Sequence, residues 1–346
     1  MKPVLSLVMT INNPGARTVA ESFSFLDELS ESDRAGLELS LICNCDGGDF
    51  IQSAREYFSK SDLALRTYQS KFKAIGSEVH SSIREAEGEW YMLLSGDDSL
   101  KAQPLSKLLQ LLQPGHIGAG VGIVAYNVIE DEPEVEWQTM PLQKVFYQPF
   151  IAYDWSELKR FSRSRLFTMN NSLFRSSLLK KSPLRMPEGS DLAEYVYSYL
   201  PLPYVKQVYY ADYDLRYTVN PGENGTGGGT EDITSKEDDL LRITRILYDV
   251  YRLEEDVRDK SQREYMYTYL TAIVSTCGLS LMMNENEKDY DRLEKLWGWM
   301  KRVDRAMYRG VRSKVLFIMN HMSGDRWSIL RRQGIKLSKR FLSLKP

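Results

Sequence analysis

Two adjacent carboxylates, Asp97 and Asp98, follow an apolar segment that is interrupted by Ser95 and Gly96. The apolar segment, residues 90–94, shows no polar alternation, which is typical of a strand covered on both faces. Each of two neighbouring carboxylates raises the free-energy cost of ionising the other. We therefore expect the pair either to face water and cap the next helix, or to bind a cation. Mg²⁺ characteristically takes one or two carboxylates together with the phosphates of its substrate.

Other polar side chains stand where earlier apolar segments end. Thr10 and Asn12 close the first segment, and Asn44 and Asp46 close the second. These segments alternate with helix-like stretches over the first 130 residues, which predicts an α/β fold with a doubly wound, mostly parallel sheet. Ligands of such sheets bind outside the carboxyl ends of the strands. We therefore expect all these side chains to lie on one rim of the sheet.

Further helices and strands are expected around this frame. Asn13-Pro14 would begin the first helix, as an N-cap followed by Pro at the first helical position. Gly88 would close a helix over residues 76–88. A short helix would open with Ser190 and Asp191, and residues beyond 235 are helical and charged. From residue 120 the pattern is more β-like, and it predicts strands at 120–131, 135–147 and 164–175.

The cysteines and glycines carry little chemistry of their own. Cys43, Cys45 and Cys277 are too few and too scattered for a disulfide framework or a zinc site. Cys43 and Cys45 alternate along a predicted strand, so we expect packing residues. The glycine-rich segment 220–230 lacks the Lys-Ser/Thr of a phosphate-binding loop and is expected to be a flexible lid or a plain linker.

Charge is distributed unevenly along the 346 residues. From residue 301 onward there are 13 Lys/Arg and two Asp, a net charge of +11, whereas the first 300 residues carry −13. Residues 326–344 interleave apolar and basic side chains, which suits an anionic membrane surface. A solvated or partner-binding helical face is the alternative. The acidic remainder shows no nucleic-acid-binding motif, so we expect no nucleic-acid partner.

The sequence also bears on location. No stretch reaches the roughly 18 apolar residues that a membrane span needs. The N-terminal residues read as a first strand and not as a signal peptide. We therefore expect a cytoplasmic protein, peripheral on the inner face of the membrane through its basic tail.

Several segments resemble, in order, family 2 glycosyltransferases of the GT-A fold. VLSLVMTINN (4–13) resembles their opening strand, and LSLICNCDGGD (39–49) resembles their second strand and acidic turn. Residues 75–100 resemble the segment that leads to their Asp-x-Asp site. NNSLFRSSLLKK and PEGSDLAEYVYSYLPL resemble the acceptor-side strand and the helix with the catalytic base. The resemblance implies a GT-A domain at 1–230 (nucleotide-sugar half 1–118, acceptor half 119–230), followed by a C-terminal helical region at 231–346.

The resemblance also implies roles at the nucleotide. Thr10 and Asn12 would line the nucleotide pocket. Asp46 would read the base, or Asn44 would do so if the turn aligns without a gap. His80 stands in the helix before the Asp pair, where the family commonly has Asn, and is carried over as a nucleotide contact.

At the reacting end, the resemblance implies that Asp97 contacts the nucleotide diphosphate through Mn²⁺ or Mg²⁺ and that Asp98 supports the metal. Ser95 replaces the first Asp of Asp-x-Asp, so its ribose or metal contact is expected to be weakened. Asp191 would be the general base. It would carry that role alone, because Ser190 occupies the place of the neighbouring acidic residue.

These roles describe one reaction. A bound cation stabilises the diphosphate leaving group as a Lewis acid, and a carboxylate takes the proton of the attacking hydroxyl. We expect a metal-dependent inverting glycosyltransferase that moves a sugar from a nucleotide-sugar donor, with UDP as the family-weighted nucleotide. The acceptor would be a glycan or lipid-linked hydroxyl in surface polysaccharide synthesis. A nucleotidyltransferase and a catalytically silent GT-A-like binding or scaffold subunit are the alternatives.

Overall fold

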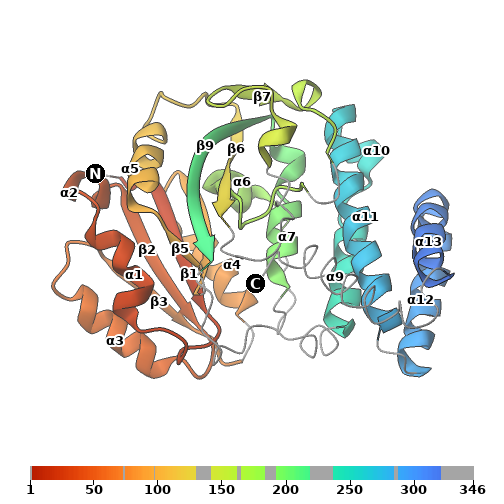
Figure 1. Cartoon of the computed structure of the whole chain (residues 1–346), viewed down its shortest axis with the longest axis horizontal. Helices are drawn as coiled ribbons and strands as arrows, with labels where there is room; N and C mark the ends of the chain where they lie inside the picture. Colours follow the sequence, from red (N-terminus) through yellow and green to blue (C-terminus); the bar gives the residue numbers. More distant parts are fainter. Residues whose placement is uncertain are drawn as a thin grey trace.

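The computed structural model describes residues 2–72, 75–96, 98–129, 142–161, 165–183, 192–218, 237–283 and 287–320. At its centre lies one sheet with strand order β3-β2-β1-β4-β8-β6-β9-β5, and β7 pairs with β9 outside this path (Figure 1). The first four strands of this order are mutually parallel, so their carboxyl ends meet at one rim. They are β3 (Leu65–Gln69), β2 (Leu37–Cys43), β1 (Leu5–Ile11) and β4 (Trp90–Ser95).

The second half of the sheet is mixed. β8 (Ser172–Arg175) runs antiparallel to both β4 and β6 (Val121–Ile129). As a result, β6 and its parallel neighbour β9 (Gln207–Thr218) run in the same direction as β4 and end at the same rim. β5 (Asp98–Leu100) and β7 (Ala152–Asp154) pair antiparallel with β9.

Helices cover both faces of the sheet. On one face the core includes side chains of α1 (Val19–Asp27), α3 (Gly48–Phe58) and α5 (Ala102–Leu111), and the short α2 (Glu31–Arg34) lies beside α5. On the other face it includes α4 (Gly76–Glu85), α6 (Ser176–Lys181) and α7 (Ala193–Tyr199). Trp90, Met92 and Leu94 of β4 are buried on the first face and Tyr91 on the second. The prediction of a strand covered on both faces is therefore confirmed.

A layer of C-terminal helices stands beside this second face (Figure 1). It consists of α9 (Glu237–Asp249), α10 (Leu253–Asp256), α11 (Lys260–Met283), α12 (Glu287–Val303) and α13 (Arg305–Asn320). The long α11 shares the core with α7, and its Tyr265 hydroxyl accepts the Phe167 N–H at 2.8 Å. Gln262 of α11 donates to the carbonyls of Leu202 and Val205, at the ends of the short 3-10 helix η3 (Leu202–Tyr204). None of the helices in the described ranges combines the length and apolarity that crossing a membrane requires.

Four expectations about individual elements are wrong. The helix expected over residues 76–88 ends at Glu85, with Ala86 and not Gly88 at its C-cap. The first helix begins at Val19 and not at Pro14, because Thr18 and Glu21 form a capping box at its N-terminus. The strand expected at 164–175 is limited to β8. Within 135–147, residues Leu142–Val145 form the 3-10 helix η1, and the preceding residues lie outside the described ranges. A further 3-10 helix, η2, spans Trp155–Glu157. The glycine-rich segment 220–230 lies outside the described ranges.

Candidate active site

The carboxyl ends of β1, β2 and β4 bring five of the predicted residues together. Thr10 is aligned with Ser95 of β4, and its hydroxyl donates to the Leu94 carbonyl at 3.1 Å. The buried Asn44 donates its amide to the Asn12 carbonyl at 2.8 Å, and its side-chain oxygen accepts the Asp46 N–H at 3.1 Å. Thr10 and Asn44 thus tie the loops of the rim to one another.

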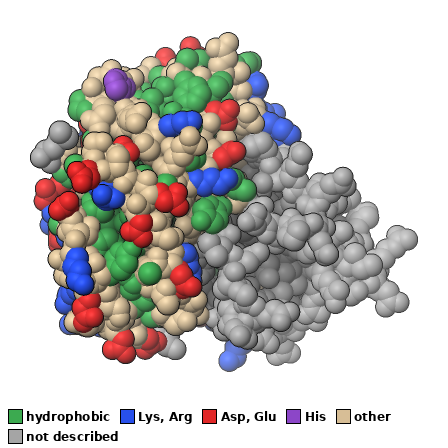
Figure 2. All heavy atoms as spheres, turned by 60° about the vertical axis from the view of Figure 1, so that its left-hand side comes forward, with side chains coloured by type: hydrophobic (Ala, Val, Ile, Leu, Met, Phe, Trp, Pro, Cys, Tyr) green, Lys and Arg blue, Asp and Glu red, His purple; other side chains and the backbone are tan. Residues whose placement is uncertain are grey.

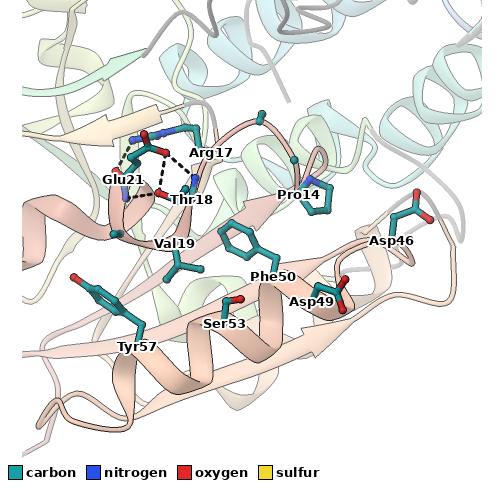
Figure 3. Close-up of a pocket in the computed structure, with 13 residues that line it drawn as sticks. Pro14, Arg17, Thr18, Val19, Glu21, Asp46, Asp49, Phe50, Ser53 and Tyr57 are labelled. Carbon is teal, nitrogen blue, oxygen red and sulfur yellow. Dashed lines mark hydrogen bonds between the residues drawn. The ribbon is translucent and has the colours of Figure 1, made fainter.

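Asp46 differs from Asn44 in being exposed. It lines a hollow of about 720 Å³ between the loop that precedes α1 and the helix α3 (Figure 3). Pro14 and Phe50 lie on the wall between Asp46 and the capping residues of α1 (Figure 3). Asp46, unlike Asn44, therefore has its side chain open to a ligand.

Cys45 stands next to Asp46 and is exposed, with its sulfur 3.5 Å from the Asp46 Oδ1 oxygen. The expectation that Cys45 is a packing residue is wrong, because β2 ends at Cys43 and the chain turns there. Cys43 is buried, as expected, and Cys277 is buried as well. Burial raises the pKa of the Cys43 thiol to about 12.

The turn after β4 approaches β1 closely at Gly96. The Gly96 N–H donates to the Thr10 carbonyl at 2.6 Å. A Cβ atom at this position would lie 2.7 Å from Ile11 Cδ1 and 3.1 Å from the Thr10 oxygen, so glycine is required here. Asp97, the next residue, lies outside the described ranges.

Asp98 begins β5 and pairs with Thr218 of β9. The following helix, α5, starts at Ala102, and its N-cap residue Lys101 makes no side-chain capping bond. The interpretation of Asp98 or Ser99 as a helix cap is therefore wrong. Asp98 therefore belongs to a strand of the sheet and does not cap a helix.

Instead, the Asp98 carboxylate forms a buried ion pair with Arg216 of β9. Asp98 is 5% exposed and Arg216 is 2% exposed. The Ser95 N–H also donates to the Asp98 Oδ2 oxygen, at 3.3 Å. Burial opposes the Arg216 charge, but the Asp98 carboxylate and the Tyr126 hydroxyl together outweigh it and raise the pKa of Arg216 above its usual value. Two opposite charges thus balance each other inside the protein.

A second arginine holds the same turn through its backbone. Arg17 donates to the carbonyls of Gly96 and Asp98, both at 3.1 Å, and to the Glu21 carbonyl at 2.6 Å. Sequence reasoning missed Arg17 and Arg216. The available signals were weak: a basic residue in the loop INNPGAR, and a single arginine inside the otherwise apolar and acidic strand YYADYDLRY.

His80 lies on α4 and is half-buried. Its Nδ1 atom is buried and has no hydrogen-bond partner among the described residues. Burial, together with the charge of Arg84, lowers the pKa of His80. The ring is therefore neutral at about pH 7, since the unperturbed value is already near 6.5.

Asp191 lies outside the described ranges, and the structure resumes at the buried Leu192, the N-cap of α7. The Tyr197 hydroxyl donates to the carbonyl of Gly76, the first residue of α4, at 3.5 Å. The helix that follows Asp191 therefore packs against the helix that carries His80.

A metal at this rim would have to be held by few protein ligands. Within the described ranges, no three His, Cys, Asp or Glu side chains are grouped in a way that would hold a metal ion. One Asp98 oxygen is already occupied by Arg216 and the Ser95 amide. A site built from one carboxylate and the oxygens of a bound diphosphate is the arrangement that Mg²⁺ commonly adopts.

Comparison with solved structures places the fold. No protein-family model and no curated protein matches the sequence. The structure is similar to S. aureus TarS (residues 1–349) in complex with UDP-GlcNAc, with a TM-score of 0.64 and 13% sequence identity over 91% of this chain and 88% of that one. A second crystal structure of S. aureus TarS (residues 1–349) gives a TM-score of 0.60 at 13% identity, with the same coverage of both chains.

A third similar structure is the mannosyltransferase PcManGT from Pyrobaculum calidifontis in complex with GDP-Man and Mn²⁺. It has a TM-score of 0.51 and 12% identity over 91% of this chain and 88% of that one. The chain therefore has a GT-A-like fold, a mostly parallel sheet flanked by helices, with C-terminal helices beside it. The predicted fold class is confirmed.

Proposed function

We propose that the protein is a metal-dependent inverting glycosyltransferase of family 2 that transfers a sugar from a nucleoside-diphosphate donor, UDP being the nucleotide we expect. The observation that carries this proposal is the rim itself. A fold shared with structures described as holding UDP-GlcNAc or GDP-Man brings Asn12, Asn44, Asp46 and Ser95 to the edge where ligands of such sheets bind. Gly96, which precedes Asp97 in the sequence, lies at the same edge.

The donor would bind along this rim. Asp46, whose side chain is exposed, would accept hydrogen bonds from the base, while Thr10, Asn12 and Asn44 would frame the pocket from below. His80 and Ser95 would border the nucleotide. Asp97 would hold the Mn²⁺ or Mg²⁺ ion that neutralises charge on the diphosphate leaving group.

The acceptor would react from the opposite side of the sugar. Asp191 would take the proton of the acceptor hydroxyl as its oxygen bonds to the anomeric carbon and the bond to the diphosphate breaks. Attack on the face opposite the leaving group inverts the configuration at that carbon. The proton ends on Asp191 and the electron pair on the departing diphosphate.

The acceptor we propose is a glycan or lipid-linked hydroxyl in surface polysaccharide synthesis. A lipid carrier would require the enzyme to work at a membrane surface, and the basic C-terminal region suits the anionic inner face. In the described part of this region, Arg305, Arg309 and Arg312 are exposed along α13. We therefore propose a cytoplasmic protein that associates peripherally with the membrane.

The test is calorimetry of UDP binding with and without Mn²⁺, on the wild type and Asp97→Ala. Metal-dependent binding that the substitution removes would support the proposal. Turnover with a screened donor, lost in Asp191→Ala while donor binding persists, would then support the role of Asp191. Intact donor binding without any turnover would favour a catalytically silent binding subunit, and release of pyrophosphate from a nucleoside triphosphate would favour a nucleotidyltransferase.

A further inference from the structure

We propose that Asp98 is not a metal ligand but a positioning residue, and that Arg216 and Arg17 together hold the turn that carries Asp97. The inference rests on the proposed function, because it assigns parts within that site. It separates two adjacent carboxylates that the sequence alone leaves equivalent.

The first argument is the state of the Asp98 carboxylate. Its Oδ2 oxygen lies between the Arg216 guanidinium and the Ser95 amide, and both ion-pair side chains are buried. A metal ligand must direct a lone pair at the cation, whereas these lone pairs already receive hydrogen bonds. A divalent cation at this oxygen would also stand against the positive charge of Arg216, with little water to screen the repulsion.

Arg216 is itself fixed and cannot swing aside to release Asp98. It donates to the carbonyls of Leu93 and Asn170, both at 3.2 Å. These contacts join β9 to β4 and to the loop that precedes β8. Separating a buried pair of this kind leaves an uncompensated charge, which is strongly destabilising. Asp98 therefore stays with Arg216 when the donor and metal bind.

Arg17 holds the other side of the turn. Its guanidinium donates to the carbonyls of Gly96 and Asp98, the two residues that flank Asp97 in the sequence. It also donates to the Glu21 carbonyl, within the first turn of α1. The Gly96 N–H adds a bond to the Thr10 carbonyl. The loop after β1 and the turn after β4 thus form one frame, which fixes Gly96 and Asp98, the neighbours of Asp97 in the sequence, relative to the pocket.

The first test compares Asp97→Asn with Asp98→Asn by calorimetry of UDP binding with and without Mn²⁺. Asparagine at 98 still offers an oxygen to Arg216 and to the Ser95 amide, but it leaves the Arg216 charge uncompensated, so urea unfolding must first show that each variant is folded under the binding conditions. We expect Asp97→Asn to lose the strengthening that Mn²⁺ gives, and Asp98→Asn to keep most of it. Equal loss in both variants would overturn the proposal. Retention in both would show that the proposed metal site is itself wrong, and the division of roles with it.

The second test asks whether Arg17 holds the turn. Arg34 is a matched control, because it also donates to backbone carbonyls, those of Leu29 at 2.7 Å and Leu26 at 3.4 Å, but on α1 and α2 away from the turn. We expect Arg17→Met to speed amide hydrogen exchange at residues 95–98. It should also weaken Mn²⁺-dependent UDP binding about tenfold, the size of effect seen for residues that orient metal ligands.

Arg34→Met should change neither quantity. Urea unfolding of both variants would confirm that each is folded under the binding conditions. If Arg17→Met exchanges and binds like Arg34→Met, Arg17 does not hold the turn and the proposal fails at that point.

Discussion

Asp46 and Asp49 line the same pocket but belong to different structures. Asp46 lies in the turn that Asn44 fixes against the loop after β1. Asp49 lies in the first turn of α3, on the wall of the pocket (Figure 3). Both carboxylates are exposed. Comparing a substitution at each therefore distinguishes a direct contact to the base from an effect of pocket charge.

We predict that Asp46→Ala weakens UDP binding and that Asp49→Ala does not. A hydrogen bond to a charged group contributes about 1.5–3 kcal/mol, which corresponds to roughly 10- to 100-fold in the dissociation constant. Calorimetry at one Mn²⁺ concentration measures both variants. Equal weakening in the two would mean that Asp46 makes no contact to the base that Asp49 lacks, and unchanged binding in both would mean that the base binds elsewhere.

Cys45 offers a chemical probe of the same place. The chain has three cysteines, and Cys45 is the exposed one while Cys43 and Cys277 are buried. We expect a thiol reagent to modify the native protein at a single position and saturating UDP with Mn²⁺ to slow this reaction. Mass spectrometry after timed alkylation gives the rate, and Cys45→Ser is the control. An unchanged rate with UDP bound would place the nucleotide away from Asp46.

At the scale of elements, Asp304 joins α13 to the rest of the helical layer. Its Oδ1 oxygen accepts the N–H groups of Ala306 at 3.0 Å and Met307 at 2.8 Å. Its Oδ2 oxygen accepts the hydroxyls of Tyr248 on α9, at 2.7 Å, and of Tyr267 on α11. Partial burial opposes ionisation, but the Met307 amide and the two tyrosines outweigh it and lower the pKa of Asp304 below 3.8.

We predict that Asp304→Ala lowers the free energy of unfolding by about 2 kcal/mol at neutral pH, from the lost cap and tyrosine bonds. Because the pKa of Asp304 is lowered in the folded state, its stabilisation is present above the unfolded value and is lost as pH falls through the folded value. The difference from wild type should therefore shrink below about pH 4.

Urea unfolding between neutral and acidic pH measures this difference. Asp259→Ala is the control. At the start of α11 the Asp259 carboxylate accepts one N–H, that of Gln262 at 2.8 Å, and it accepts no tyrosine hydroxyl within the described part of the chain. Asp259→Ala should lower the free energy of unfolding by about 1 kcal/mol. A loss as small for Asp304→Ala would mean that the tyrosine bonds contribute no stability.

The elements also show where sequence patterns suffice and where they fail. The apolar run at 90–94 predicted β4 because burial on both faces removes alternation. The predicted start of α1 at Pro14 is wrong, although the sequence holds a signal for the true start, because Thr18 and Glu21 have the spacing of a capping box. β5 has no local signal. Three residues form this strand because β9 pairs with them, and Asp98 meets Arg216 across 118 positions of sequence.

At the scale of the whole molecule, charge divides the chain. The net charge is −13 over residues 1–300 and +11 from residue 301 onward. Figure 2 shows acidic and basic side chains interspersed over the described face that carries the left-hand helices of Figure 1, so that face presents no field of one sign. On α13, in contrast, Arg305, Arg309 and Arg312 are exposed at helical spacing. Within the described residues, exposed basic side chains therefore gather along α13.

We predict that the full chain co-sediments with vesicles containing phosphatidylglycerol and not with vesicles of phosphatidylcholine alone. Each basic residue near an anionic surface contributes about 1 kcal/mol, so reversing Arg305, Arg309 and Arg312 to Glu should release most of the protein. Replacing three exposed lysines of the first 118 residues with Glu changes the net charge equally and should leave binding intact. These lysines are Lys60, Lys71 and Lys107.

High salt should also weaken the interaction, because the Debye length falls from about 10 Å at 0.1 M to about 3 Å at 1 M. Loss of binding in both triple variants would assign the attraction to net charge and not to the C-terminal end. Binding to neutral vesicles, unchanged by salt, would instead indicate apolar insertion by the residues beyond 320. Absence of binding to either vesicle would leave the basic end to a partner protein, and would remove the membrane from the proposed setting of the reaction.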